Sequence, residues 1–329
     1  MSTPTANTDT PELTFDAFEV PVRVGEAKYV ASEANAKKLA YSVDDESGWV
    51  VGAEDDRRVH PALMSEYLWW PQGFYVQEPE GAGHFDQFWN KFPSLVEYPF
   101  LHSRTVGKFY QAPKVEETIH AVADVVEKYE RRNKDFVVIR ALYTNDSGER
   151  LAEYSHTIMI RSRVDLSSPP VGGGGSQTDS KQTSPAVESV GARPEAKTSE
   201  VTSYTAQLTL AHARLFSLPT ESFHTHDSIA QEYGFPKAVP QGLMSFAYLS
   251  RLCTEYFGSD WANSGEIDVK FIGMLYRDDT LTVSGTAVSE DTATDDPSLI
   301  TLKLHIDDQN GRRVAVGTAR GHRRNPETD

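Results

Sequence analysis

Residues 242–258, GLMSFAYLSRLCTEYFG, place apolar side chains at the three- and four-residue spacing of a helix. Gly258 supplies a stop signal at the end of this run. Four strand-like runs follow, separated by turn signals such as Arg277-Asp278-Asp279, and they read IDVKFIGML, TLTVSGTAV, LITLKLHID and RVAVGTARG. The helix can bury its apolar stripe only against the sheet that those strands make. The pattern therefore predicts an α+β domain in which an antiparallel sheet wraps around one long central helix.

The first half of the chain repeats this order of elements. FEVPVRVG predicts a strand, as Tyr204–Ala211 does in the second half, and SEANAKKLAYSV predicts a helix with Ser32 as its N-cap. A long helix is expected to begin at HPALMSEYLWW, and the aromatic-rich residues 71–100 are expected to pack as a long loop. Three further runs predict long strands: TIHAVADVVEKYERR, DFVVIRALYTN and RLAEYSHTIMIRSR. The first of them could be a helix by composition, but its β-branched residues favour a strand.

Residues 167–199 separate the two halves. They are rich in Ser, Pro, Gly and Thr, contain no aromatic residue, and cannot bury enough area to offset their ordering entropy. A chain of 329 residues corresponds to about two domains, at roughly 100–200 residues each. The sequence therefore predicts a disordered tail over 1–10, a first domain over 11–166, a flexible linker over 167–199 and a second domain over 200–325.

Charge and cysteine content exclude several classes of protein. The formal net charge of −16 disfavours binding to nucleic acid or to an anionic membrane, since both require a positive surface. Cys253 is the only cysteine, which excludes an intramolecular disulfide and a cysteine-based zinc site. No stretch reaches the ~20 consecutive apolar residues of a membrane helix, and the first residues lack a secretory signal. We therefore expect a cytoplasmic protein, with a mitochondrial or peroxisomal location left open for a eukaryotic source.

A cluster of ionisable side chains precedes the central helix of the second half. Glu221, His224, His226 and Asp227 lie within seven residues. General acid–base chemistry needs a group that titrates near neutrality, which a histidine supplies, and a partner that fixes its tautomer, which a carboxylate can supply. The unpaired amides of a helix start, here around Gly242, can stabilise developing oxyanion charge. The cluster therefore predicts a site for acid–base catalysis.

Simpler explanations account for several of these polar residues. Asp227 fits an ordinary N-cap for the short helix SIAQEYG. His224 and His226 flank one threonine, so in an extended segment their rings point to opposite faces, and no metal site is expected. Structural or solvent-facing roles are expected for seven other histidines: His60, His84, His102, His120, His156, His305 and His322.

The segment around these residues resembles the hydratase motif of the MaoC-like, hydratase-2 group of hot-dog-fold proteins. That motif runs Asp-x-Asn-Pro-x-His-x-Asp-x-x-x-Ala-x-x-x-Gly-Phe and is followed by His-Gly at the start of the central helix. DVKFIGMLYRDDTLTVSGTAV is similar to the family's strand pair, and the first half is similar to its N-terminal dehydratase domain, from VHPAL to the long strands. Five residues match the motif without a gap: His224, Ala230, Gly234, Phe235 and Gly242.

The resemblance implies a double hot-dog protein, with two antiparallel sheets each wrapped around a long central helix. It implies reversible addition of water to a 2-enoyl thioester, giving a 3-hydroxyacyl thioester, usually with R stereochemistry and with no metal or organic cofactor. The substrate would be an acyl-CoA or an acyl-carrier thioester. The C-terminal half would be catalytic, while the N-terminal half would be non-catalytic and make room for the acyl chain. The two halves can pair within one chain, and a homodimer of such chains is possible by analogy.

Several positions depart from the family's motif. The ungapped match places Pro219 where the family has its aspartate, Glu221 at the asparagine, His226 at the second aspartate and Gln241 at the helix-start histidine. A Gln-Gly pair at the helix start resembles the branch of mesaconyl-type CoA hydratases and mitochondrial hydroxyacyl-thioester dehydratases. A second registration pairs Glu221 with His226 at the family's spacing, but it requires a deletion of two residues afterwards.

The leading hypothesis assigns His224 as the general acid/base, Glu221 as its carboxylate partner and Gly242 as the oxyanion donor. His226 and Asp227 are further catalytic candidates, and Gln241 is a candidate for binding substrate. A non-catalytic hot-dog module that binds an acyl thioester or serves in assembly is the rival hypothesis. A thioesterase is less favoured, because its carboxylate usually lies on the central helix, where Glu255 is the only acid and comes late.

Overall fold

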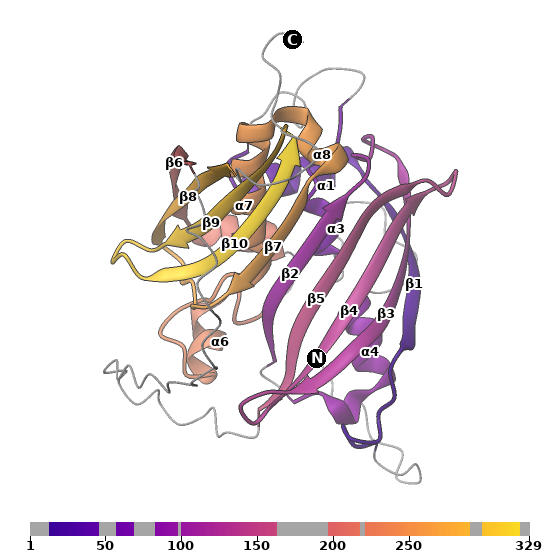
Figure 1. Cartoon of the computed structure of the whole chain (residues 1–329). Coiled ribbons are helices and arrows are strands. Elements are labelled where there is room, and N and C mark those ends of the chain that lie inside the picture. The colour runs from indigo at the N-terminus through magenta and orange to yellow at the C-terminus, as the bar shows by residue number, and fades with distance from the viewer. Residues whose placement is uncertain are drawn as a thin grey trace, which may run out of the picture.

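The computed structural model describes residues 13–45, 57–68, 83–97, 100–162, 197–217, 221–289 and 298–322. Its ten strands form one antiparallel sheet in the order β1-β3-β4-β5-β2-β7-β10-β9-β8-β6 (Figure 1). The first half supplies β1 (Val22–Val30), β2 (Leu101–Phe109), β3 (Thr118–Glu130), β4 (Lys134–Asn145) and β5 (Arg150–Ser162). The second half supplies β6 (Lys197–Leu208), β7 (Glu266–Phe271), β8 (Asp279–Ser289), β9 (Leu299–Asp307) and β10 (Arg313–His322).

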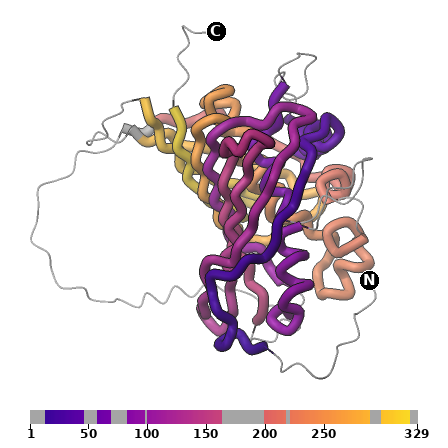
Figure 2. Tube along the Cα trace, turned by 90° about the vertical axis from the view of Figure 1, so that its right-hand side faces the viewer, coloured from indigo at the N-terminus to yellow at the C-terminus, as the bar shows by residue number. Residues whose placement is uncertain are grey.

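Helices cover the concave interior of this sheet. They are α1 (Glu33–Ser42), α3 (Leu63–Glu66), α4 (His84–Lys91), α5 (Leu210–Ser217), α6 (Asp227–Glu232), α7 (Gly242–Phe257) and α8 (Trp261–Ser264), with short 3-10 turns at Pro93–Leu95 and Gly258–Asp260. Figure 2 shows α1, α4 and the α5–α6 segment on the same side of the sheet. Among the described residues, no helix is long and apolar enough to cross a membrane.

The two halves meet where β2 pairs with β7. The antiparallel register runs from Arg104 opposite Lys270 to Lys108 opposite Glu266. Arg104 reinforces this seam with two hydrogen bonds, of 2.7 and 2.6 Å, to the carboxylate of Asp268. Each half has the same internal strand order, which is 1-3-4-5-2 in the first and 6-8-9-10-7 in the second. The two expected sheets are thus joined edge to edge into one, as in a double hot-dog.

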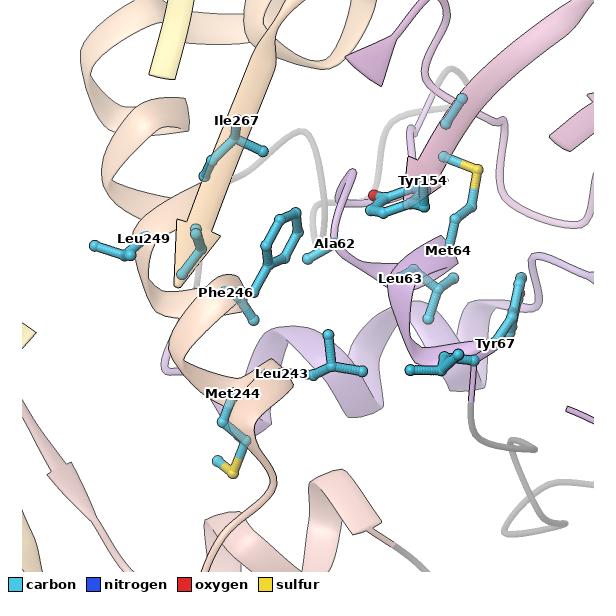
Figure 3. Packing of buried hydrophobic residues seen from close by; sticks show 14 of the residues in the cluster. Ala62, Leu63, Met64, Tyr67, Tyr154, Leu243, Met244, Phe246, Leu249 and Ile267 are labelled. Carbon is cyan, nitrogen blue, oxygen red and sulfur yellow. The ribbon is translucent and has the colours of Figure 1, made fainter. Parts of the chain in front are cut away.

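The central helix α7 is held by its buried apolar face, as the sequence predicts. Leu243, Phe246 and Leu249 are fully buried. Figure 3 shows Leu243 and Phe246 directed toward Ala62 and Leu63, so α7 packs against the first half as well as its own sheet. The helix ends at Gly258, whose φ of 73° is a left-handed conformation that suits glycine.

Every predicted strand overlaps an observed one, β2 is an additional strand beyond those predicted, and one predicted strand differs at its end in the second half. The first expected strand there stops at Leu208 rather than Ala211, because Leu210–Ser217 form α5. The hydroxyl of Thr209 accepts a hydrogen bond from the amide of His212 at 3.1 Å and so caps this helix. In the first half, Ser32 caps α1 as predicted, accepting from the amide of Asn35 at 3.2 Å.

The long helix expected in the first half is wrong over the described residues. Only Leu63–Glu66 are α-helical there. A longer helix would use the carbonyls of Tyr67 and Leu68 for its own hydrogen bonds. Here they accept instead from the amides of His84 and Phe85, at 3.2 and 2.9 Å respectively. The first amides of α4 thus end α3. Residues 69–82, which include the rest of that predicted helix and part of the aromatic-rich loop, lie outside the described residues.

Most of the predicted linker also lies outside the described residues, which resume at residue 197. Its last three positions, residues 197–199, belong to β6, because residues 197–201 pair antiparallel with β8. The predicted tail over 1–10 lies outside the described residues as well.

Besides the buried His60, three histidines lie in or next to the interior of the first half. His84 and His156 have no exposed surface, and His102 packs beside His156 with 5.3 Å between ring centroids. Burial lowers the pKa of His84 to about 4 and that of His102 to about 3, and it also lowers the pKa of His156 well below its ordinary value. All three rings are therefore neutral at pH 7.

These buried histidines make the fold sensitive to acid. An unfolded histidine titrates near pH 6.5, so below that value the unfolded chain binds protons that folded His84 does not bind until about pH 4. The stability contributed by this difference falls as pH decreases, by about 1 kcal/mol for one such histidine between pH 7.5 and 5.5. We expect His84→Gln to flatten the decline in the urea midpoint over that range. His120→Gln, at an exposed strand position, should not flatten it, and an unchanged slope in His84→Gln would contradict the prediction.

Candidate active site

A tight turn positions the histidines upstream of α7. The amide of His226 donates to the carbonyl of Ser222 at 3.0 Å, and the hydroxyl of Thr225 accepts from the amide of Ser222 at 3.1 Å. Phe223, within this turn, packs into a small apolar cluster with Ala230 and Val239. The turn and this anchor together fix the backbone of the intervening His224.

His224 is tied to the chain that leads into α7. Its Nδ1 lies 2.6 Å from the carbonyl oxygen of Val239. A carbonyl can only accept, so Nδ1 carries the hydrogen, and the neutral ring has its lone pair on Nε2. Burial lowers the pKa of His224 to about 4, partly opposed by the bond to Val239, while part of the side chain stays accessible. His224 is therefore a neutral, oriented imidazole, and no residue in the described part of the chain forms a hydrogen bond with its Nε2.

The start of α7 offers unpaired amides, and it follows three residues after Val239, the hydrogen-bond partner of this imidazole. Gln241 is the N-cap, and its side chain makes no capping hydrogen bond. Within the described residues, the amides of Gly242 and Leu243 donate to no carbonyl outside the helix, as expected for the first turn. A Cβ on Gly242 would lie 3.4 Å from Cγ of Phe271, an ordinary contact, so Phe271 lines this helix start. The amides and the positive end of the helix suit an oxygen that gains negative charge.

Asp227 acts as a structural clamp in this segment. Its carboxylate accepts hydrogen bonds from the amide of Ala238 at 2.8 Å and from Nε and Nη2 of Arg277 at 2.7 and 2.5 Å. The hydrogen bond from Arg277 is the main cause that lowers the pKa of Asp227 to about 2. The backbone amide of Arg277 also donates to the carbonyl of Ala238 at 3.0 Å. The sequence predicts Asp227 as the N-cap of this short helix. In the structure the N-cap is His226, and Asp227 is the first residue of α6.

The carboxylate and the second histidine of the predicted site are not joined to His224. Glu221 is exposed, and within the described residues no hydrogen bond links it to His224 or His226. His226 instead places Nδ1 2.9 Å from the hydroxyl of Thr225. Pro219, the counterpart of the family's aspartate, lies outside the described residues.

Sequence reasoning missed the partners that organise the site. The carbonyl of Val239 has no side-chain signal, and Arg277 is 50 residues from Asp227 in the chain. It also missed a pair in the first half, where His60 and Asp45 are both buried and His60 Nε2 lies 3.5 Å from the carboxylate. His60 Nδ1 accepts from the amide of Ala62 at 3.1 Å, so this pair is locked inside the fold beside α3.

The fold resembles several solved structures. A MaoC-like dehydratase aligns with a TM-score of 0.68 at 11% identity, covering 92% of this chain and 98% of its own. A MaoC-like dehydratase from Phytophthora capsici gives 0.62 at 14% identity, covering 93% and 96%. A Mycobacterium tuberculosis protein described as a double hotdog fold gives 0.55 at 12% identity, covering 94% and 98%. At these identities the likeness concerns the fold.

The sequence itself matches one family model. Residues 187–309, which include the candidate site and α7, match the MaoC like domain. No curated protein matches the chain in sequence. The family match covers the half that carries His224, and the solved structures extend the same architecture across both halves. The chain therefore has a double hot-dog fold, and its residues 187–309 match the MaoC like domain.

Proposed function

We propose that the protein is a hydratase/dehydratase that interconverts 2-enoyl and 3-hydroxyacyl thioesters. The observation that carries the proposal is the neutral imidazole of His224, which is oriented by the carbonyl of Val239, three residues before the start of α7. The family supports the reaction class, since structural neighbours of this chain are named dehydratases. The resemblance in motif supports coenzyme A as the carrier and R stereochemistry.

The arrangement suits addition of water across a conjugated double bond. Nε2 of His224 takes a proton from water while the water oxygen bonds to C3, and the π electrons move toward the thioester oxygen. The amides of Gly242 and Leu243 stabilise that oxygen, a contribution typically worth about 3–4 kcal/mol. The imidazolium then returns its proton to C2, so water is added in full. A pKa of about 4 makes the free imidazole a weak base but makes the imidazolium a strong acid for this last step.

Substitution of the two histidines distinguishes their roles. We expect His224→Gln to lower kcat on 2-enoyl-CoA by about 10²–10⁴-fold, because it removes the only oriented base position described at the site. His226→Gln should change kcat by less than about threefold, since Nδ1 of His226 faces the hydroxyl of Thr225 in its own turn. The assay is loss of the enoyl-thioester absorbance band. The reverse pattern would assign catalysis to the Glu221–His226 registration.

Glu221 is the second discriminating position. The sequence suggests that Glu221→Gln should abolish most activity, but in the structure this side chain is exposed and makes no hydrogen bond to His224. We therefore expect a change in kcat/KM of less than about threefold. A loss of orders of magnitude, with an unchanged melting temperature, would show that the carboxylate joins His224 when substrate binds.

Asp227 should act on the site through the chain that carries Val239. Asp227→Asn weakens the contacts to Arg277 and Ala238, and we expect a loss of about 1 kcal/mol in stability because both charged side chains are partly exposed. Hydrogen exchange at the amide of Ala238 should accelerate, and kcat should fall with it. Asp278→Asn is the control. It also removes a contact to Arg277, but it leaves the hydrogen bond between Asp227 and the amide of Ala238, so exchange at that amide should stay slow. Equal exchange in the two variants would contradict the clamp.

One observation favours the rival, a binding module without catalysis. No carboxylate is bonded to His224 among the described residues, whereas the family resemblance implies an aspartate–histidine pair. Products separate the possibilities, because hydration consumes the enoyl band without releasing thiol, a thioesterase releases thiol, and a binding module does neither. Glu255 gives a thioesterase little support, since it pairs with Arg251 at 2.9 Å late in α7.

A further inference from the structure

A polar relay lies inside the first half, across the β2–β7 seam from α7. It consists of His102 and Thr105 on β2 and His156 on β5. The hydroxyl of Thr105 lies 2.9 Å from Nε2 of His102 and 3.2 Å from Nδ1 of His156. Thr105 and His156 have no exposed surface, whereas His102 retains some. The relay therefore runs from an accessible end to a fully buried end.

The hydrogen-bond partners fix the direction of the relay. Nε2 of His102 lies 3.1 Å from the carbonyl of Arg104, which can only accept, so this nitrogen carries a hydrogen. This one hydrogen is shared between the carbonyl of Arg104 and the hydroxyl oxygen of Thr105, so Thr105 is left to donate its own hydrogen to Nδ1 of His156. Because burial keeps His156 neutral, its remaining hydrogen is on Nε2. The buried end of the relay is thus an N–H donor.

This donor has no partner within the described part of the chain. Nε2 of His156 is buried and makes no hydrogen bond there. A buried donor without an acceptor is unfavourable, so the position favours a bound group that brings an oxygen. No group of three or more His, Cys, Asp or Glu side chains among the described residues could hold a metal ion, so the clustered imidazoles do not form a metal site.

The relay is adjacent to the candidate active site through Phe271. The ring of Phe271 lies 5.0 Å from that of His102, between centroids, and the same ring faces Gly242 at the start of α7. An acyl chain whose thioester oxygen sits at Gly242 would pass along Phe271 to reach His102 and then His156. The relay would meet the acyl group beyond its reacting carbons.

We propose that this relay is a subsite for an oxygen atom on the acyl chain, so that the preferred substrates are 2-enoyl thioesters with a hydroxyl or keto group. The inference rests on the proposed function. A neutral oxygen is favoured over a carboxylate, because the relay offers one neutral donor, and the nearby Arg104 is engaged by Asp268. A saturated hydrocarbon chain would leave His156 unpaired.

The test compares 2-enoyl-CoAs of equal length with and without a keto or hydroxyl group, placed in turn at each carbon from C4 outward. The wild-type protein should prefer one oxygenated member by about tenfold in kcat/KM. His156→Leu removes the donor, and Thr105→Val removes the relay hydroxyl while keeping its shape. Both should lose the preference, because KM for the oxygenated substrate is no longer lower than KM for the plain substrate of equal length. Thr105→Ser keeps a hydroxyl and should keep the preference.

Equal rates on plain and oxygenated substrates, or a preference that survives in His156→Leu, would overturn the proposal and leave internal water as the partner of this donor. If His156→Leu does not fold, the Thr105 pair decides by the same criterion. If the wild-type protein hydrates no enoyl-CoA, the proposed function fails, and calorimetry with saturated acyl-CoAs judges the subsite separately. Tighter binding of an oxygenated acyl-CoA that is lost in Thr105→Val supports it, and equal binding overturns it.

Discussion

The pairing of β2 with β7 is the contact on which the rest of the molecule depends. It joins two five-stranded halves of identical strand order into one sheet, and Arg104 and Asp268 brace it from opposite sides of the seam. Because of this pairing, Phe271 of the second half lies against His102 of the first. The helix start at Gly242 and the buried interior of the other half thereby become neighbours.

Chemistry in the second half is set by backbone groups as much as by side chains. The carbonyl of Val239 fixes the tautomer of His224, and in the proposed mechanism the first amides of α7 hold the thioester oxygen. Asp227 is anionic but is committed to holding Arg277 and Ala238. The first half shows the contrasting case, where His60 and Asp45 are both buried beside α3.

The sequence is sufficient to predict the elements whose signal is local. Alternating apolar residues identify most strands, and the apolar stripe of Gly242–Phe257 identifies the central helix. The early end of α3 is not local, because it depends on hydrogen bonds from His84 and Phe85 across a long insertion. At the site, the hydratase-like motif picks out His224, but its partner is a backbone carbonyl, which no residue type reveals. The sequence does not reveal that Arg277 pairs with Asp227; it shows only a cation within a predicted turn.

The seam has a further consequence for how such a chain avoids association with others. In an isolated half, β2 or β7 would be a free strand edge, able to template pairing with a foreign strand. Joining the halves in one polypeptide gives the two edges a high effective concentration for each other, so they meet before either meets another chain. Covalent linkage between β5 and β6 thus favours pairing of β2 with β7 within one chain during folding.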